Sequence, residues 1–150
     1  MITRLFEIVI AVNDFDAGVK KFSGVLGAQP RFLKEEHIPM PGFNAATFHV
    51  GDVTISISAS RQPDTPVARF LQTRGEGVYL VGLEVTDIEQ DMRKLAEKGV
   101  EFASEKPIPY RYGKQSFARP KSMYGVPVFL AEHDVGYYER FLQDTNTGAE

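Results

Sequence analysis

The chain has 150 residues, ordinary shares of apolar and charged residues, and a net charge of −3. This length suits one globular domain with one hydrophobic core, and so small a negative charge gives no indication of the basic surface expected of a protein that binds nucleic acid or a membrane. Because the sequence contains no cysteine, disulfides and thiolate chemistry are excluded too.

No targeting or spanning segment is recognisable in the sequence. The N-terminus lacks the basic and then apolar pattern of a secretion signal, and no apolar run approaches the roughly 18 residues of a membrane span. We therefore expect a soluble, cytoplasmic protein whose partner is a small molecule or another protein.

The first half of the chain predicts a strand, a helix and then three strands. Asp14 is expected to cap the helix and Gly27 to end it, while Pro39, Pro41 and Gly42 indicate a loop. The expected elements are a strand at 5–12, a helix at 14–27, a short strand from Phe32, a loop at 35–42, and strands at 43–50 and 53–59.

The second half predicts the same order after a polar seam at 60–64 and a short helix at 65–73. Its expected elements are a strand at 78–85, a helix at 87–98 stopped by Gly99, a strand at 100–103, a loop at 104–114, and strands at 116–119 and 126–132. Residues 134–143 predict an amphipathic helix that either seals one end or binds a second subunit. The tail from Asp144 is expected to be frayed.

An internal repeat relates the two halves. A shift of about 73 positions places Phe6–Asp16 on Tyr79–Glu89, so that Asp14 meets Asp87. The same shift places Val53–Ile57 on Val126–Leu130. The sequence therefore predicts two copies of one structural module.

Two strand–helix–three-strand units joined by a short linker resemble the vicinal oxygen chelate superfamily, which includes glyoxalases and bleomycin-resistance proteins. The segments most similar to one branch of it, methylmalonyl-CoA epimerase, are Thr65–Leu71, Arg74–Gly77, Lys98–Val100, Pro120–Ser122 and Gly125–Val126. The resemblance implies an α+β fold of two paired βαβββ modules that form a curved half-open barrel, plus a C-terminal helix. We expect a single domain with module one at 1–60, a linker helix at 61–77, module two at 78–133, and the C-terminal helix and tail at 134–150.

The resemblance also implies four inward positions that hold a divalent metal in the superfamily. In this chain they are Glu7, Ser56, Leu80 and Phe129. One carboxylate, one hydroxyl and two hydrocarbon groups cannot replace the hydration shell of a divalent ion, so we expect no metal and no cofactor. The epimerase pattern also has a glutamate base in a loop where this chain has Met40-Pro41-Gly42, so epimerase activity of that kind is not expected.

Glu7 is the most informative candidate for a catalytic residue. A carboxylate in a mostly apolar cavity has its pKa raised toward the range useful for proton transfer. The alternative is a structural role, in which Glu7 pairs with a cation or bonds to Ser56 and Ser58. His49 is a second acid–base candidate, expected to share a strand face with Phe43, Ala45 and Thr47, and its alternative is a solvated histidine beside a turn. His37 and His133 are weaker candidates, because they lie in a loop and at a strand end.

The loop Tyr110-Arg111-Tyr112, together with Arg119, is the candidate ligand-binding segment. An arginine between two tyrosines binds planar or anionic ligands by stacking and paired hydrogen bonds, but the same residues are also typical of subunit interfaces. Leu80 and Phe129 make the expected cavity apolar, which favours an organic ligand. Alternatively, they fill the barrel and leave no cavity.

Three functions therefore stay open for this sequence. The preferred one is a metal-independent site for a hydrophobic or aromatic small molecule, with Ser56, Ser58, Leu80, Tyr110, Arg111, Tyr112, Arg119 and Phe129 as ligand contacts. It serves either to sequester the compound or to move a proton on it through Glu7 and His49. The second is a metal-free isomerase, epimerase or lyase acting on an acyl-CoA or oxo acid, and the third is an inactive structural or regulatory relic. Because members of this superfamily form dimers, the resemblance implies a homodimer.

Overall fold

The structure is a computed structural model that describes residues 1–37 and 42–148, and its chain divides into two compact units. Unit 1 consists of Met1–Glu7 and Leu80–Arg140, and unit 2 consists of Ile8–Tyr79 and Phe141–Glu150. The strands β1 (Ile2–Ala11) and β5 (Gly77–Val85) and the helix α4 (Tyr137–Asp144) run through the boundaries between them.

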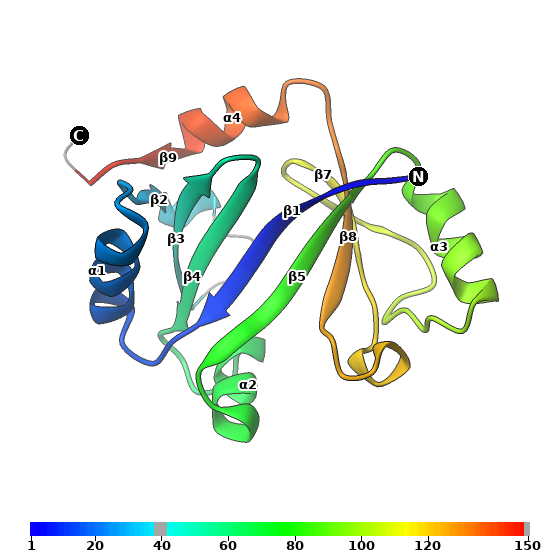
Figure 1. The fold of residues 1–150 in the computed structure, drawn as a ribbon, viewed down its shortest axis with the longest axis horizontal. Coiled ribbons are helices and arrows are strands. Elements are labelled where there is room, and N and C mark those ends of the chain that lie inside the picture. Colours follow the sequence, from blue (N-terminus) through cyan, green and yellow to red (C-terminus); the bar gives the residue numbers. More distant parts are fainter. Residues whose placement is uncertain (38–41, 149–150) are drawn as a thin grey trace. The chain divides into compact units, whose positions relative to one another are not determined.

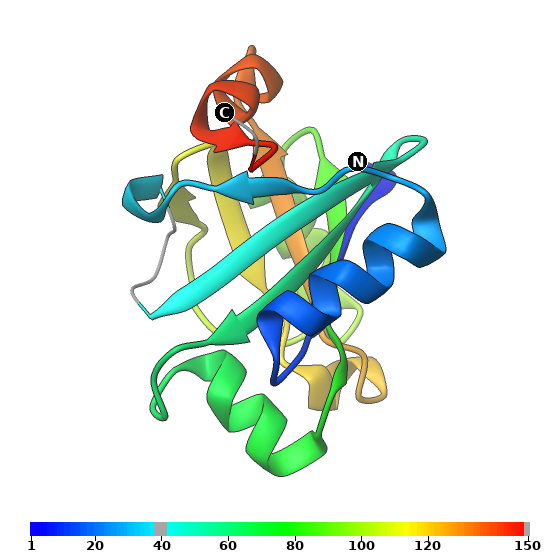
Figure 2. The same ribbon diagram turned by 90° about the vertical axis from the view of Figure 1, so that its left-hand side faces the viewer.

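Unit 2 has a sheet with strand order β1-β4-β3-β2-β9. Helix α1 lies across the face of β3 and β4 (Figure 2). The elements that follow β1 are α1 (Phe15–Leu26), β2 (Arg31–Leu33), a 3-10 turn (Glu35–His37), β3 (Phe43–Val50), β4 (Val53–Ser60), α2 (Pro66–Arg74) and, from the C-terminal end of the chain, β9 (Thr145–Asn146).

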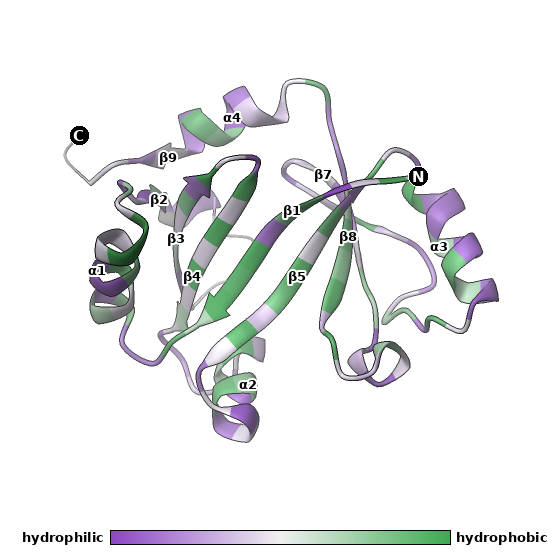
Figure 3. Ribbon diagram, viewed as in Figure 1, coloured by the Kyte–Doolittle hydropathy of each residue, from purple (hydrophilic) through white to green (hydrophobic). Residues whose placement is uncertain are grey.

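The core of unit 2 follows from the alternation of residues along β3 and β4. Phe48 and Ile57 are both fully buried and pack with Val19 of α1, and burial of each such side chain contributes roughly 1.5–3 kcal/mol. Figure 3 shows the hydrophobic bands that alternate with more polar ones along β4. One face of these strands is therefore apolar and covered by α1, and the other face is polar.

Unit 1 has strand order β6-β7-β8-β5-β1 (Figure 1). The β5–β8 pair is parallel, whereas β6–β7 and β7–β8 are antiparallel, so the sheet is mixed. Its further elements are α3 (Ile88–Glu97), β6 (Ile108–Tyr110), β7 (Gly113–Phe117), a 3-10 turn (Pro120–Met123) and β8 (Val128–His133).

The internal repeat is visible in the way the two long helices begin. The side chain of Asp14 accepts a hydrogen bond from the amide of Ala17, and that of Asp87 accepts one from the amide of Gln90, both at 3.1 Å. Each carboxylate thereby satisfies one of the free amides at a helix start. With four α-helices and nine strands in the described part of the chain, the predicted α+β class is confirmed.

Three sequence-based expectations about local structure are wrong. The tail from Asp144 is not frayed, because β9 pairs with β2 and Thr145 is only 2% exposed. The expected loop at 104–114 contains β6, which pairs with β7, while the expected strand at 100–103 is reduced to a single bridge between Phe102 and Ala118. The expected loop at 35–42 begins as a 3-10 turn, and Met40 and Pro41 lie outside the described residues.

Candidate functional site

One face of the sheet in unit 1 is covered by α3. Leu83, Val85 and Leu130 point toward that helix and pack with its residues Ile88 and Met92. Because side chains alternate along a strand, their neighbours in β5 and β8 point the other way. We call this second surface the helix-free face of unit 1 because α3 does not cover it, although Tyr137 at the start of α4 contacts it. Its residues on these strands are Leu80, Gly82, Glu84, Phe129, Ala131 and His133.

Aromatic rings pack closely on the helix-free face. The ring of Phe129 meets Phe6 edge-on at 5.6 Å between centroids and stacks on Phe117 at 5.5 Å. Gly82 leaves room for this packing, because a Cβ atom there would lie 2.7 Å from the ring of Phe129 and 2.8 Å from that of Phe6. Phe129 is 5% exposed, and the expectation that Leu80 and Phe129 make a ligand cavity apolar stays a prediction.

A carboxylate and an imidazole face each other on the same surface. Nδ1 of His133 lies 2.7 Å from Oε2 of Glu84. The guanidinium of Arg4 also donates two hydrogen bonds to Glu84, from Nε at 3.0 Å and from Nη2 at 3.2 Å, and Nη2 lies 3.1 Å from the hydroxyl of Tyr137. Such a two-pronged arginine–carboxylate contact fixes the orientation of both groups.

The protonation states of this group follow from burial and from its hydrogen bonds. Burial lowers the pKa of His133 and outweighs the opposite effect of the Glu84 carboxylate. Burial alone would raise the pKa of Glu84, but hydrogen bonds from Arg4 and His133 lower it below its usual value. At neutral pH Glu84 is therefore ionised and His133 neutral, so the ring donates its Nδ1 proton to Glu84 and keeps an unprotonated Nε2.

The imidazole of His133 is enclosed by aromatic rings. Tyr137 stacks on it at 3.9 Å between centroids, Phe6 meets it edge-on at 4.8 Å, and Tyr110 lies at 6.5 Å. Only 7% of the His133 side chain is exposed. A carboxylate that fixes the tautomer of a buried imidazole is the arrangement that prepares histidine for proton transfer.

Glu7 lies near Tyr110 of the candidate ligand-binding segment. Burial raises the pKa of Tyr110, and the charge of Glu7 raises it further. Tyr110 ends β6 and Tyr112 lies in the two-residue turn that follows, with their rings 5.8 Å apart and nearly perpendicular. The hydroxyl of Tyr110 therefore keeps its proton at any working pH and acts as a hydrogen-bond donor.

The two arginines of the candidate segment lie at opposite ends of β7. Arg111 is exposed in the turn, and its carbonyl oxygen accepts a hydrogen bond of 2.6 Å from Nη1 of Arg140. Arg119 is exposed at the opposite end of β7, just before the 3-10 turn. The structure therefore brings Glu7 and Tyr110 near each other but does not bring Arg119 to the tyrosines.

The remaining predicted residues share one face of the sheet in unit 2. In the register of β3 and β4, His49 lies opposite Thr54, Thr47 opposite Ser56, and Ala45 opposite Ser58. The expectation that His49 shares a face with Ala45 and Thr47 is thus confirmed, and this is the face that α1 does not cover.

The environment of His49 keeps its ring neutral at neutral pH. Nδ1 lies 3.3 Å from the hydroxyl of Thr54, and the ring of Phe141 meets the imidazole edge-on at 5.8 Å. Burial lowers the pKa of His49, and the charge of Arg31 lowers it further.

Sequence reasoning missed the Glu84–His133–Arg4 group. His133 was a weaker candidate because it ends a strand, and Arg4 precedes the strand expected from residue 5. The available signal was the charged Glu84 within the otherwise apolar run Val78–Val85. A charge in such a strand requires a partner.

Comparison with known proteins agrees with this architecture. The family profile of the Glyoxalase/Bleomycin resistance protein/Dioxygenase superfamily matches residues 6–118. The uncharacterized protein YqjC of Bacillus subtilis strain 168 is 28% identical over 130 residues, which cover 86% of this chain and 91% of YqjC.

Solved structures show the same likeness. A hypothetical protein of Bacillus halodurans C-125 superposes with a TM-score of 0.77 at 28% identity, covering 87% of this chain and 94% of that one. A variant of Streptomyces coelicolor methylmalonyl-CoA epimerase in complex with 2-nitronate-propionyl-CoA superposes with a TM-score of 0.75 at 25% identity, covering 89% and 99%.

The repeated strand and helix order and the likeness to these structures define a protein of the glyoxalase-like α+β class. The chain belongs to the Glyoxalase/Bleomycin resistance protein/Dioxygenase superfamily. No helix within residues 1–37 and 42–148 has the length and apolar character needed to cross a membrane.

The residues of this chain do not fit the divalent metal that the superfamily implies. In the described part of the chain, no three His, Cys, Asp or Glu side chains are grouped so that they could hold an ion. Two of the four corresponding positions, Leu80 and Phe129, carry hydrocarbon side chains, and the ring of Phe129 is packed between Phe6 and Phe117. Neither can donate an electron pair to a metal.

Proposed function

We propose that this protein binds a small apolar or aromatic organic molecule and moves a proton on it without a metal ion. The observation that carries the proposal is the neutral imidazole of His133, held by Glu84 on the same helix-free face as Leu80 and Phe129. A pocket with apolar walls and a few fixed polar groups is the usual setting for such chemistry.

Two groups of unit 1 are the proposed proton carriers. Nε2 of His133 has the free electron pair needed to accept a proton from carbon, and Glu7 is the carboxylate near Tyr110. The proton removed from a carbon beside a carbonyl group leaves negative charge on the carbonyl oxygen, and the Tyr110 hydroxyl is suited to donate a hydrogen bond to it. Return of the proton to the same or a neighbouring carbon gives an epimerase or an isomerase.

The solved relatives supply the first substrates to test. Several of them are methylmalonyl-CoA epimerases, so acyl thioesters with an acidic proton come first, followed by aromatic and aliphatic oxo acids. Ser56, Ser58, Tyr112, Arg111 and Arg119 stay predicted ligand contacts, and His49 stays a predicted acid–base residue. The single-domain organisation and the homodimer also stay predictions.

Exchange of carbon-bound hydrogen for solvent deuterium tests the proposal directly. The protein, treated with a chelator and dialysed, is incubated in heavy water with each compound, and loss of the proton signal beside the carbonyl group is followed by NMR. We expect exchange that is unchanged by the chelator and reduced at least about a hundredfold in Glu7→Gln or His133→Gln, the scale of general acid–base catalysis. Glu97→Gln, an exposed carboxylate on α3, is the matched control.

The alternatives predict different results. Exchange that requires added Mn²⁺, Co²⁺, Ni²⁺ or Zn²⁺ would contradict metal independence. Binding of a compound, seen as a rise in melting temperature, with no exchange would favour a sequestering protein, which should tolerate the loss of either Glu7 or His133. Absence of both binding and exchange across the panel would favour an inactive relic.

A further inference from the structure

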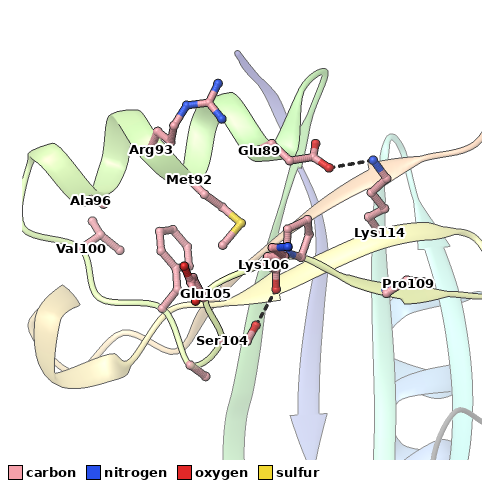
Figure 4. A pocket seen from close by; sticks show the side chains of 13 residues that line it. Glu89, Met92, Arg93, Ala96, Val100, Ser104, Glu105, Lys106, Pro109 and Lys114 are labelled. Carbon is pink, nitrogen blue, oxygen red and sulfur yellow. Dashed lines mark hydrogen bonds and ion pairs between the residues drawn. The ribbon is translucent and has the colours of Figure 1, made fainter.

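A cleft with a volume of about 930 Å³ lies in unit 1 on the side of the sheet covered by α3. One wall is a stripe of α3 formed by Glu89, Met92, Arg93 and Ala96, which lie on one face of the helix because they are three and four residues apart. The other wall is the segment 100–109, and Figure 4 shows the two walls facing each other across the gap. The cleft is separate from the helix-free face that carries His133.

The floor of the cleft is apolar and continuous with the core. Met92 and Phe102 line the cleft and also belong to the cluster packed beneath α3. Ala96 and Val100 extend the apolar surface toward the end of the helix, and the small side chain of Ala96 keeps the space open. A flexible methionine beside an aromatic ring is suited to accommodate ligands of varied shape.

Hydrogen bonds hold the second wall in place. The amide of Ala103 donates to the carbonyl oxygen of Phe117 in β7 at 2.8 Å. The hydroxyl of Ser104 donates to the carbonyl oxygen of Lys106, also at 2.8 Å. The wall is therefore formed before any ligand arrives, which lowers the entropic cost of binding.

The charges at the rim favour an anion. At one end Nζ of Lys114 lies 2.8 Å from Oε1 of Glu89, so these two charges neutralise each other. Arg93 and Lys106 are two further cations of the lining, against the single remaining acid Glu105. Within residues 1–37 and 42–148 neither cation forms an ion pair, although the whole chain has a net charge of −3.

We propose that this cleft is a second binding site, for a small organic anion with an apolar body and one negatively charged group. Its volume matches the range of roughly 300–1,000 Å³ found for small-molecule sites. The apolar body lies against Met92, Val100 and Phe102, and the charged group lies toward Lys106, since Figure 4 shows the guanidinium of Arg93 pointing away from the gap. This site does not depend on the chemistry proposed for the other face of the sheet.

Two probes of equal chain length and opposite charge test the proposal, namely dodecanoate and dodecyltrimethylammonium. Binding is followed by NMR of the methionine methyl groups, among which Met92 reports on the cleft. We expect dodecanoate to shift the Met92 signal in a saturable way and to bind at least about tenfold more tightly than the cation, a difference of about 1.4 kcal/mol. Equal binding of the two probes, or no shift at Met92, would overturn the proposal.

Matched variants locate the binding. The double variant Arg93→Glu with Lys106→Glu should weaken dodecanoate binding about tenfold, whereas Lys94→Glu with Lys98→Glu, which changes charges outside the lining, should weaken it less than about twofold. Ala96→Trp should fill the cleft and abolish binding, and Glu97→Trp at the next, exposed position should not. Circular dichroism confirms that each variant is folded.

The proposals for the two sites can be tested independently of each other. Glu7→Gln and His133→Gln should leave dodecanoate binding unchanged, because neither residue lines the cleft. If these variants weaken binding as much as Arg93→Glu with Lys106→Glu, the probe binds at the other face and the proposal for this cleft is wrong.

Discussion

Nδ1 of His133 lies 2.7 Å from Oε2 of Glu84, a contact that joins the end of β8 to the parallel strand β5. The same carboxylate accepts hydrogen bonds from Nε and Nη2 of Arg4, at the start of β1. One side chain therefore ties three strands of unit 1 together and decides which nitrogen of the imidazole holds the proton. Structure and proposed chemistry depend on the same carboxylate.

Replacing Glu84 with glutamine should destabilise the protein by about 2 kcal/mol, because hydrogen bonds to charged groups contribute roughly 1.5–3 kcal/mol each and Arg4 would lose its charged acceptor. Urea denaturation measures the change. In the same variant, nitrogen NMR of His133 should show a mixture of tautomers in place of one.

The exposed carboxylate of Glu89 is the control for that substitution. It pairs with Lys114 at a similar distance, 2.8 Å, but its side chain is 44% exposed. Glu89→Gln should therefore cost less than about 1 kcal/mol. Equal losses in the two variants would mean that the Glu84 group contributes no more than an ordinary surface pair.

Gly82→Ala should destabilise unit 1 by about 1–3 kcal/mol, the usual cost of overpacking. The added Cβ would lie under 3.0 Å from the rings of both Phe129 and Phe6, and neither ring is free to move away because each is packed against further aromatic groups. Thermal or urea unfolding gives the value.

Replacing a second glycine, Gly24, by alanine should raise the stability of the protein. A Cβ at Gly24, within α1, would meet no atom within 4 Å. Gly24→Ala should therefore stabilise the protein by about 0.5–1 kcal/mol, because alanine has the higher helix propensity. A loss of stability in this variant would show that α1 is strained or packed differently from the structure.

Stability should fall as the pH is lowered from about 7 to 5. The pKa values of His133 and His49 are lowered, in both cases chiefly by burial. The unfolded chain therefore binds a proton at each histidine more readily than the folded one, so both contributions are present above the unfolded pKa of about 6.5 and are lost below it. Glu84, with its lowered pKa, adds a further loss at more acidic pH.

Single substitutions separate the two histidines. His133→Gln and His49→Gln should each flatten the dependence of unfolding free energy on pH in this window, and the double variant should remove most of it. An undiminished slope in the double variant would assign the acid sensitivity to other groups. Urea titrations at several pH values make the measurement.

The repeat and the helix caps could be predicted because they depend on neighbours in sequence. Asp14 and Asp87 cap equivalent helices through hydrogen bonds to residues three positions away. Alternation in β3 and β4 likewise placed His49 on one face with Ala45 and Thr47, and the repeated order of strands and helices predicted the fold class through the resemblance that it carries. Each of these features is local or periodic, so the residues themselves specify it.

The Glu84–His133–Arg4 group could not be predicted in the same way, because its members are 49 and 80 positions apart. The length of β1 and the strand order bring them together, and the sequence predicted β1 to begin only at Leu5. In the segment Tyr110-Arg111-Tyr112, by contrast, closeness in sequence did not place all three side chains together. Its residues are adjacent in sequence, but strand geometry directs Tyr110 toward His133 and leaves Arg111 exposed.

The C-terminal tail was expected to fray because the last residues of a domain are usually poorly ordered. The structure shows instead that Arg31 holds it, with Nε donating to Oγ1 of Thr145 at 2.8 Å and Nη2 donating to the carbonyl oxygens of Leu142 and Thr145. No local pattern in the sequence links Arg31 to a threonine 114 positions later.

Thr145→Val should therefore destabilise the protein by about 1–2 kcal/mol, because it keeps the shape of a buried side chain but removes the acceptor for Arg31 and the donor to the carbonyl oxygen of Phe141. Hydrogen exchange should accelerate at the amides of β2 and β9, which pair through Phe32 and Leu33. Thr73→Val is the control, because that exposed hydroxyl bonds only within α2 and its loss should change stability by less than about 0.5 kcal/mol. If exchange at β2 is unchanged in Thr145→Val, the tail contributes nothing to the order of that strand.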